Sequence, residues 1–155
     1  MYRGLGSGQV VSSWSLNVEY KTTKQMANIN NLQMAKAVCA DSRISIRKSL
    51  FGLRTNVVYN PTGSEVDVKT IEYAPESGAQ WRHILSQPRA SLRPLLADFH
   101  PQPVVNGNYM MEVCVSRDGG FVALQLFQYE QLGYEPASDM LIYEGEDAHA
   151  LAQIV

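Results

Sequence analysis

The sequence predicts an α+β protein with a largely antiparallel sheet of about six or seven strands in two groups. Short segments of alternating apolar and polar residues are joined by tight turns, which favours antiparallel pairing. One long segment, residues 79–99, has the apolar spacing of a helix but contains two prolines. We therefore expect a proline-broken central helix, with short flanking helices packed on one face of the sheet.

The start of the chain is rich in glycine, with Gly4, Gly6 and Gly8, so residues 1–8 predict a flexible arm and residues 9–155 a single domain. Alternation between Val10 and Tyr20 predicts the first strand. From Lys24 to Ala40 an apolar residue recurs at every third position, which predicts a helix. Asparagines favour turns, so this helix alternatively begins only after Asn31.

Short strands follow in the middle of the chain. Arg43 to Arg47 alternates cations with isoleucines, and Gly52 predicts a bulge or a tight bend. Leu53 to Tyr59 then runs into the turn sequence of residues 60–63, Asn-Pro-Thr-Gly, which predicts a hairpin. In its return strand, Glu65 to Tyr73, the apolar residues stand first at even positions and then at odd positions. We therefore expect a bulge or an early end of the strand.

The clearest helical pattern spans Ala79 to Phe99, where Pro88 and Pro94 predict either two short helices or one sharply kinked helix. Residues 108–116 and 121–129 form the strongest predicted hairpin, because an Asp-Gly turn separates two apolar runs. Residues 141–143 predict a further strand. Glu146 and Asp147 then mark the first turn of a last short helix, where carboxylates complement the helix dipole.

Charge is divided by position along the chain. Residues 1–105 hold twelve Lys and Arg against seven Asp and Glu, whereas residues 106–155 hold one cation, Arg117, against eight acids. If the two parts fold against each other, these charges pair inside the molecule. If they lie at opposite poles, they drive head-to-tail association or recruit a charged partner.

The composition indicates a cytoplasmic protein that does not associate with membranes. The apolar runs are far below the roughly 18–20 residues that span a bilayer, and the N-terminus lacks a signal-peptide pattern. Cys39 and Cys114 are interpreted as small core residues in a reducing compartment. Three scattered histidines give no ligand spacing, so we expect neither a metal site nor a cofactor.

A basic segment supplies the main candidate binding site: Arg43, Arg47, Lys48, Arg54 and Tyr59. These residues, with Phe51 and with three further arginines at positions 82, 89 and 93, predict contact with a nucleic-acid backbone and stacking of a base. Alternatively, the arginines solubilise one face or pair with the acids of the last third of the chain. Tyrosines are a second candidate set, because they anchor protein interfaces at low entropy cost: Tyr109, Tyr129, Tyr134 and Tyr143.

Three short motifs occur in the order arginine, serine-containing strand and Glu-x-Glu: Tyr2-Arg3-Gly4, Ser13-Trp14-Ser15 and Glu144-Gly145-Glu146. In this order they resemble the motifs of ADP-ribosyltransferases. The resemblance implies that Arg3 holds the phosphates of NAD, that Ser13 or Ser15 supports the nicotinamide side, and that Glu146 stabilises the oxocarbenium-like sugar. The plainer interpretation is a flexible start of the chain and an acidic first helical turn.

Apart from these motifs, the usual enzyme fingerprints are missing: the sequence has no Gly-x-Ser-x-Gly elbow, no phosphate loop and no dinucleotide fingerprint. We therefore expect a non-catalytic interaction or assembly protein. It would bind a protein partner or itself, forming a homo-oligomer through an exposed strand edge or through its opposed charges. An ADP-ribosyltransferase-like enzyme and a nucleic-acid-binding module are the two alternatives.

Overall fold

The computed structural model describes residues 24–52 and 54–155. Its elements, in chain order, are β1 (Lys24–Met26), α1 (Ala35–Cys39), β2 (Ile44–Lys48), β3 (Thr55–Tyr59), β4 (Ser64–Tyr73), α2 (Pro75–Ser86), α3 (Leu92–Leu96), β5 (Tyr109–Ser116), β6 (Phe121–Glu130), β7 (Gly133–Pro136), β8 (Leu141–Glu144) and α4 (Gly145–Ala152). Short 3₁₀ turns at Ile29–Asn31, Leu50–Gly52 and Arg89–Ser91 link some of them. The arm and first strand predicted before residue 24 lie outside the described residues.

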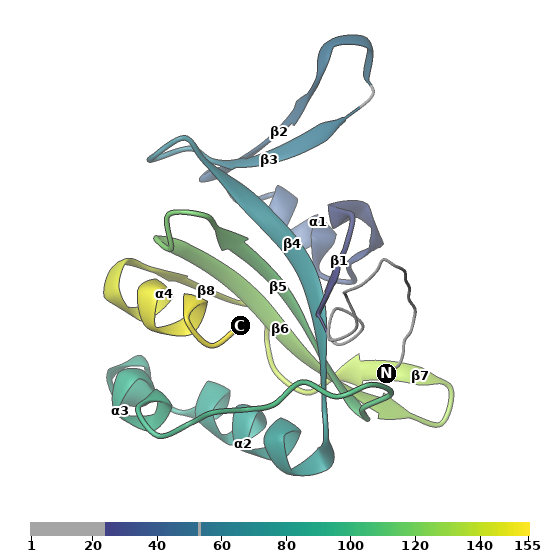
Figure 1. Ribbon diagram of the computed structural model, residues 1–155, viewed down its shortest axis with the longest axis vertical. Helices are drawn as coiled ribbons and strands as arrows, with labels where there is room; N and C mark the ends of the chain where they lie inside the picture. Colours follow the sequence, from purple (N-terminus) through teal and green to yellow (C-terminus); the bar gives the residue numbers. More distant parts are fainter. Residues whose placement is uncertain (1–23, 53) are drawn as a thin grey trace, which may run out of the picture.

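The strands form one antiparallel sheet in the order β2-β3-β4-β5-β6-β7, and β1 and β8 pair with β4 and β6 (Figure 1). This confirms the α+β class and the antiparallel pairing. The long strands β4, β5 and β6 are the centre of the sheet, while β2 and β3 form a separate hairpin group at one end. None of the helices among the described residues has the length and the apolar character that a membrane span requires.

The sheet is covered on both faces, so the molecule has two apolar cores. The first core lies under α2, α3 and α4 and includes Trp81, whose ring lies 4.9 Å from that of Phe99. The second core lies on the opposite face beside α1 and includes Val38 and Phe121. The helices after residue 74 thus share one face, as expected, and α1 covers the other.

Strand β4 passes between the two cores, and this corrects the predicted bulge. Its register with β5 is unbroken from Val66 to Tyr73. Val66 and Val68 point into the second core, whereas Ile71 and Tyr73 point into the first. Successive side chains of a strand point to opposite faces of the sheet. A strand whose apolar residues face first one core and then the other therefore shifts from even to odd positions without any bulge.

The helix predicted from Lys24 to Ala40 is wrong in its first half. Residues 24–26 instead pair with β4 as a strand, and Asn28 then caps a 3₁₀ turn through a hydrogen bond from the Asn30 amide at 2.9 Å. Only Ala35–Cys39 is helical. Cys39 is exposed at its end, so the prediction that it is a core residue is wrong, while Cys114 is buried as expected.

The central helix breaks at Pro88, as predicted, and α2 ends at Ser86. Pro94 does not cause a second break, because it stands in the first turn of α3, where its missing N–H has no helical partner to lose. The β5–β6 hairpin forms as predicted. Asp118 stabilises its turn by accepting the Gly120 amide at 2.9 Å, and Gly119 supplies the positive φ.

Candidate functional site

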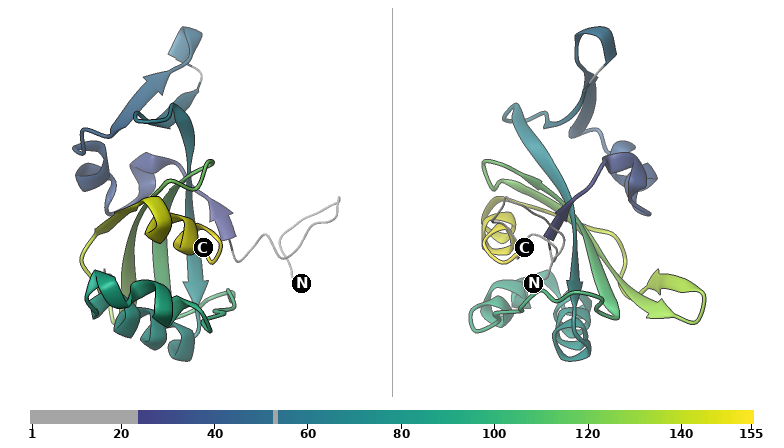
Figure 2. Two further views of the ribbon diagram at one scale, coloured as in Figure 1. Left: turned by 90° about the vertical axis from the view of Figure 1, so that its left-hand side faces the viewer. Right: turned by 45° about the vertical axis from the view of Figure 1, so that its right-hand side comes forward.

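The predicted basic residues lie on or next to the β2–β3 hairpin, which projects from the body of the molecule (Figures 1 and 2). The structure divides them into two groups. Arg43 and Tyr59 lie at the base of the hairpin, against the end of β8. Arg47, Lys48 and Arg54 lie further out, toward its tip.

The base of the hairpin is a closed network of charges. The Arg43 guanidinium donates to Asp41 at 2.7 Å and to Glu144 at 2.6 Å, and the Tyr59 hydroxyl donates to the same Glu144 carboxylate. The Arg43 hydrogen bond lowers the pKa of Asp41 to about 2. The bond to Glu144, together with burial, raises the pKa of Tyr59 to about 12, and the pKa of Glu144 is lowered in return.

This network ties the hairpin to the body. The Tyr59 ring is buried, with its centroid 5.0 Å from that of Phe121 in the second core. A buried ring is not available to stack on a base, and the Arg43 fork is already bonded to two carboxylates. The base of the hairpin therefore acts as an anchor that fixes the direction in which the tip projects.

The tip of the hairpin is cationic and partly apolar. The side chains of Arg47, Lys48 and Arg54 are exposed and make no ion pair with any described residue. Phe51, 85% exposed, stands between them with a left-handed φ of 68°, and Ile46 is 40% exposed. A positive φ is unfavourable for a bulky residue, so the tip combines strain, charge and exposed apolar surface.

Strand β2 is also an edge strand of the sheet. The Asn60 amide donates to the Arg43 carbonyl at 2.7 Å, and the Ser49 amide donates to the Arg54 carbonyl at 2.8 Å. Because hydrogen-bonded pairs alternate along an antiparallel ladder, the odd-numbered residues of β2 bond to β3. The amides and carbonyls of Ile46 and Lys48 point away from β3, where no described strand pairs with them.

The opposite edge strand of the sheet is β7, which forms a hairpin with β6 that the sequence pattern did not predict. This hairpin is acidic: Glu130 and Glu135 are exposed and have no cation within ion-pair distance among the described residues. It too has exposed apolar surface, because Leu132 is fully exposed at its turn and Tyr129 is 53% exposed. The two tyrosines that flank the turn, Tyr129 and Tyr134, pack with ring centroids 5.3 Å apart.

The outer edge of β7 is open in the same way as that of β2. The Ala137 amide donates to the Leu126 carbonyl at 2.8 Å, which makes that pair hydrogen-bonded. Because hydrogen-bonded pairs alternate along the β6–β7 ladder, the backbone groups of Tyr134 and Pro136 point away from β6. Pro136 has no N–H, so its nitrogen needs no hydrogen-bond partner at this edge. The two remaining tyrosines of the predicted interface, Tyr109 and Tyr143, are buried in the first core.

Other charged residues form ion pairs or ring contacts within the molecule. Arg93 bonds to Glu146 at 2.6 Å and to Asp147 at 3.1 Å, and Arg117 contacts two of the three acids of β4, Glu65 and Asp67. Arg89 lies over the Tyr143 ring, 4.5 Å from its centroid, and Arg82 donates to Gln128 at 3.2 Å. These arginines are thus part of the folded body and are not aligned with the tip cations.

Of the residues to which the resemblance to ADP-ribosyltransferases gives a role, the structure describes Glu146. Arg3 and Ser15 lie outside the described residues. Glu146 is an exposed residue in the first turn of α4, where it pairs with Arg93. Both features match the plainer interpretation of an acidic helical start.

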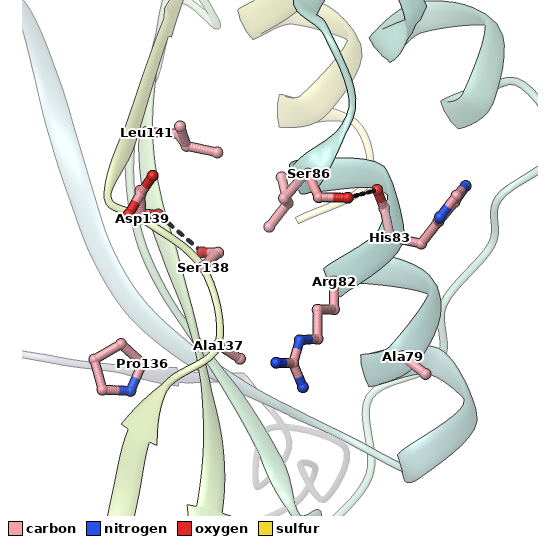
Figure 3. Close-up of a pocket in the computed structure, with 10 residues that line it drawn as sticks. Ala79, Arg82, His83, Ser86, Pro136, Ala137, Ser138, Asp139 and Leu141 are labelled. Carbon is pink, nitrogen blue, oxygen red and sulfur yellow. Dashed lines mark hydrogen bonds between the residues drawn. The ribbon is translucent and has the colours of Figure 1, made fainter.

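A groove of about 650 Å³ runs between α2 and the segment that joins β7 to β8 (Figure 3). Its lining mixes small residues with polar ones, including Arg82, His83 and Ser86. The Ser86 hydroxyl donates to the His83 carbonyl at 2.7 Å, so it is not activated by a neighbouring base. Among the described residues, no group of three His, Cys, Asp or Glu is arranged to hold a metal ion.

Comparison of the chain with protein-family models, curated proteins and solved structures finds no significant match. The two hairpins are therefore the features of the molecule that point to a function.

Proposed function

We propose that this protein is a non-catalytic assembly protein that associates with copies of itself through surface contacts. The observation that carries the proposal is the pair of projecting hairpins, which bear opposite, uncompensated charge. The β2–β3 tip carries three cations and the β6–β7 hairpin carries two carboxylates. Each also exposes a large apolar side chain, Phe51 on one and Leu132 on the other.

Charge and apolar surface act together in such contacts. Opposite charges steer two molecules toward each other and exclude like-charged partners. Exposed apolar side chains supply the area whose burial stabilises the contact. Arg43, Arg93 and Arg117 form ion pairs with carboxylates of the same chain, whereas the cations and carboxylates of the two hairpins form none with any described residue. These two hairpins are therefore the surfaces from which the molecule attracts another copy.

Static light scattering tests the proposal on the full chain. We expect a weight-average molar mass that rises above 17.3 kDa with protein concentration at low salt. It should fall again as salt is raised from about 0.01 M to about 1 M, where the Debye length shrinks from about 30 Å to about 3 Å. A mass of one chain at every concentration and every ionic strength would refute self-association.

A matched pair of charge reversals locates the contact. Arg47→Glu should weaken association about fivefold or more, because exchanging an attractive pair for a repulsive one costs about 1 kcal/mol. Lys36→Glu makes the same change of charge at an exposed position of α1 and should leave association unaltered. Equal effects of the two variants would show that net charge, and not the hairpin, controls association.

The nucleic-acid alternative keeps one specific observation in its favour, namely the unpaired tip cations beside Phe51. A single-stranded oligonucleotide would bind there by phosphate contacts and by stacking on the exposed ring. Fluorescence anisotropy at low salt tests this alternative. Binding that weakens with salt and is lost in the Arg47→Ala, Arg54→Ala double variant would support it, and no binding at low salt would dismiss it.

A further inference from the structure

We infer that the copies join head to tail, with the β2 edge of one molecule pairing with the β7 edge of the next so that the sheet continues across the contact. This inference rests on the proposed self-association and specifies its geometry. The two strands are the opposite ends of the path β2-β3-β4-β5-β6-β7, and each has one edge without a strand partner among the described residues.

The direction of the strands fits this contact. Every neighbouring pair along the path is antiparallel, so β2 and β7, which are separated by five such steps, run in opposite directions. A second copy that continues the sheet, turned only by the twist that accumulates across the strands, therefore presents β2 antiparallel to β7. The strand order then repeats without a break from one copy to the next.

The outward backbone groups define a register. Ile46 on β2 and Tyr134 on β7 each direct an N–H and a C=O outward, so placing them opposite each other lets them exchange two hydrogen bonds. Ile46 then lies beside the Tyr134 ring, an aliphatic–aromatic pair of the kind that stabilises neighbouring strands. This contact covers the exposed part of Ile46.

The same register brings opposite charges together. Arg47 comes to lie opposite Gly133, which has no side chain, and beyond that glycine its neighbour on β6 is Glu130. Adjacent strands are about 4.8 Å apart, so Arg47 and Glu130 are separated by roughly 10 Å between Cα atoms, within the combined reach of their side chains. Glu135 is the diagonal neighbour of Arg47 on the same face.

Like charges disfavour the symmetric alternatives. Two β2 edges would bring together Arg47 and Lys48 from both copies, and two β7 edges would bring together the carboxylates of Glu130 and Glu135. Charged residues on an edge strand usually protect it from pairing with itself. Here the opposite charges of the two edges disfavour β2–β2 and β7–β7 contacts and favour the β2–β7 contact. This contact is heterologous, so copies add one after another in a row that either stays open or closes into a ring.

Proline substitutions at the two outward positions test the geometry. Ile46→Pro and Tyr134→Pro each remove one outward N–H without removing a hydrogen bond to the neighbouring strand of the same molecule. Ile46→Val and Tyr134→Phe are the matched controls, since they make a small change to the side chain, retain the aliphatic–aromatic contact and keep the amide. Circular dichroism and thermal unfolding of all four variants establish that they remain folded.

Light scattering on the two proline variants, alone and mixed, gives the decisive result. Each variant alone should be monomeric, because each lacks one of the two edges. An equimolar mixture should form a 1:1 dimer of twice the chain mass and stop there, because one intact β2 meets one intact β7. The control variants Ile46→Val and Tyr134→Phe should still form longer assemblies.

The other outcomes separate this inference from the proposed function. A wild-type chain that is monomeric under all conditions overturns both. Wild-type association together with undiminished assembly of Ile46→Pro, or dimers of Tyr134→Pro alone, overturns the head-to-tail geometry and leaves self-association intact. Two monomeric variants whose mixture stays monomeric, while the wild type associates, would also overturn the β2–β7 pairing.

Discussion

Gly78 gives a quantitative test of how α2 packs on the sheet. It lies inside α2 over β5, and a Cβ added there would come within 2.0 Å of Tyr109 Cδ2 and 2.1 Å of Cγ. Carbon atoms in contact are about 3.5–4 Å apart, so Gly78→Ala requires a shift of roughly 1.5 Å. Tyr109 is buried and its backbone is paired with both β4 and β6, so that shift cannot be made freely.

Two opposing effects set the magnitude. Replacing glycine by alanine inside a helix stabilises it by about 1 kcal/mol. Forcing an extra carbon into a packed core costs about 1–3 kcal/mol, and we take about 3 kcal/mol because the overlap involves a ring held in place on both sides. The net expectation for Gly78→Ala is a loss of about 2 kcal/mol, or roughly 4–8 °C in Tm for a chain of this size.

Denaturant and thermal unfolding, followed by circular dichroism, measure this change. Ala79→Gly is the matched control, because Ala79 is the exposed neighbour in the same helix and reports the propensity effect alone. It should cost about 1 kcal/mol. If Gly78→Ala instead stabilises the protein by about that amount, α2 does not approach Tyr109 as described.

Two further predictions concern the hairpin anchor and the cysteines. The pKa values of Asp41 and Glu144 are lowered in the folded state by Arg43 and Tyr59, so the stability they contribute is present above their unfolded pKa and is lost as the pH falls toward about 2. Arg43→Leu should flatten this loss in unfolding curves measured between pH 5 and about pH 2, and an unchanged slope would contradict the network. For the cysteines, Cys39 is exposed, whereas burial raises the pKa of the Cys114 thiol to about 12. Titration with a thiol reagent at mildly alkaline pH should therefore modify one thiol in the native chain and both in denaturant, and rapid modification of both in the native chain would show that Cys114 is accessible.

Much of the fold was predictable because it depends on local chemistry. The β3–β4 and β5–β6 turns follow from Asn-Pro-Thr-Gly and Asp-Gly, and the end of α2 follows from Pro88. The acids at 146 and 147 likewise marked the start of α4. In each of these cases a few adjacent residues determine the backbone conformation.

The features that were missed depend on contacts between distant residues. Residues 24–26 are a strand because they pair with β4, and the change of parity in β4 is explained only by the second core. One signal for that core was present: β5 and β6 are apolar almost without interruption, which is typical of strands covered on both faces. Strand β7 was missed because Gly133 and Pro136 leave almost no alternating pattern.

The candidate site was predictable in part. The basic segment was identified by its residues, but only the structure separates Arg43 and Tyr59, which anchor the hairpin, from Arg47, Lys48 and Arg54 at its tip. The reason is that Glu144 lies a hundred residues away along the chain. The divided charge predicted either internal pairing or association. In the structure Glu144, Glu146 and Asp147 pair with arginines of the same chain, whereas Glu130 and Glu135 form no ion pair with a described residue.

Amide hydrogen exchange at the two sheet edges tests the central claim most directly. The outward amides of Ile46, Lys48 and Tyr134 have no strand partner within the described part of one copy, and should exchange rapidly at low protein concentration. The account predicts that the Ile46 and Tyr134 amides become protected together as the concentration rises at low salt, while the amides of the exposed β6–β7 turn remain fast. Association without protection at either edge would contradict sheet continuation between copies.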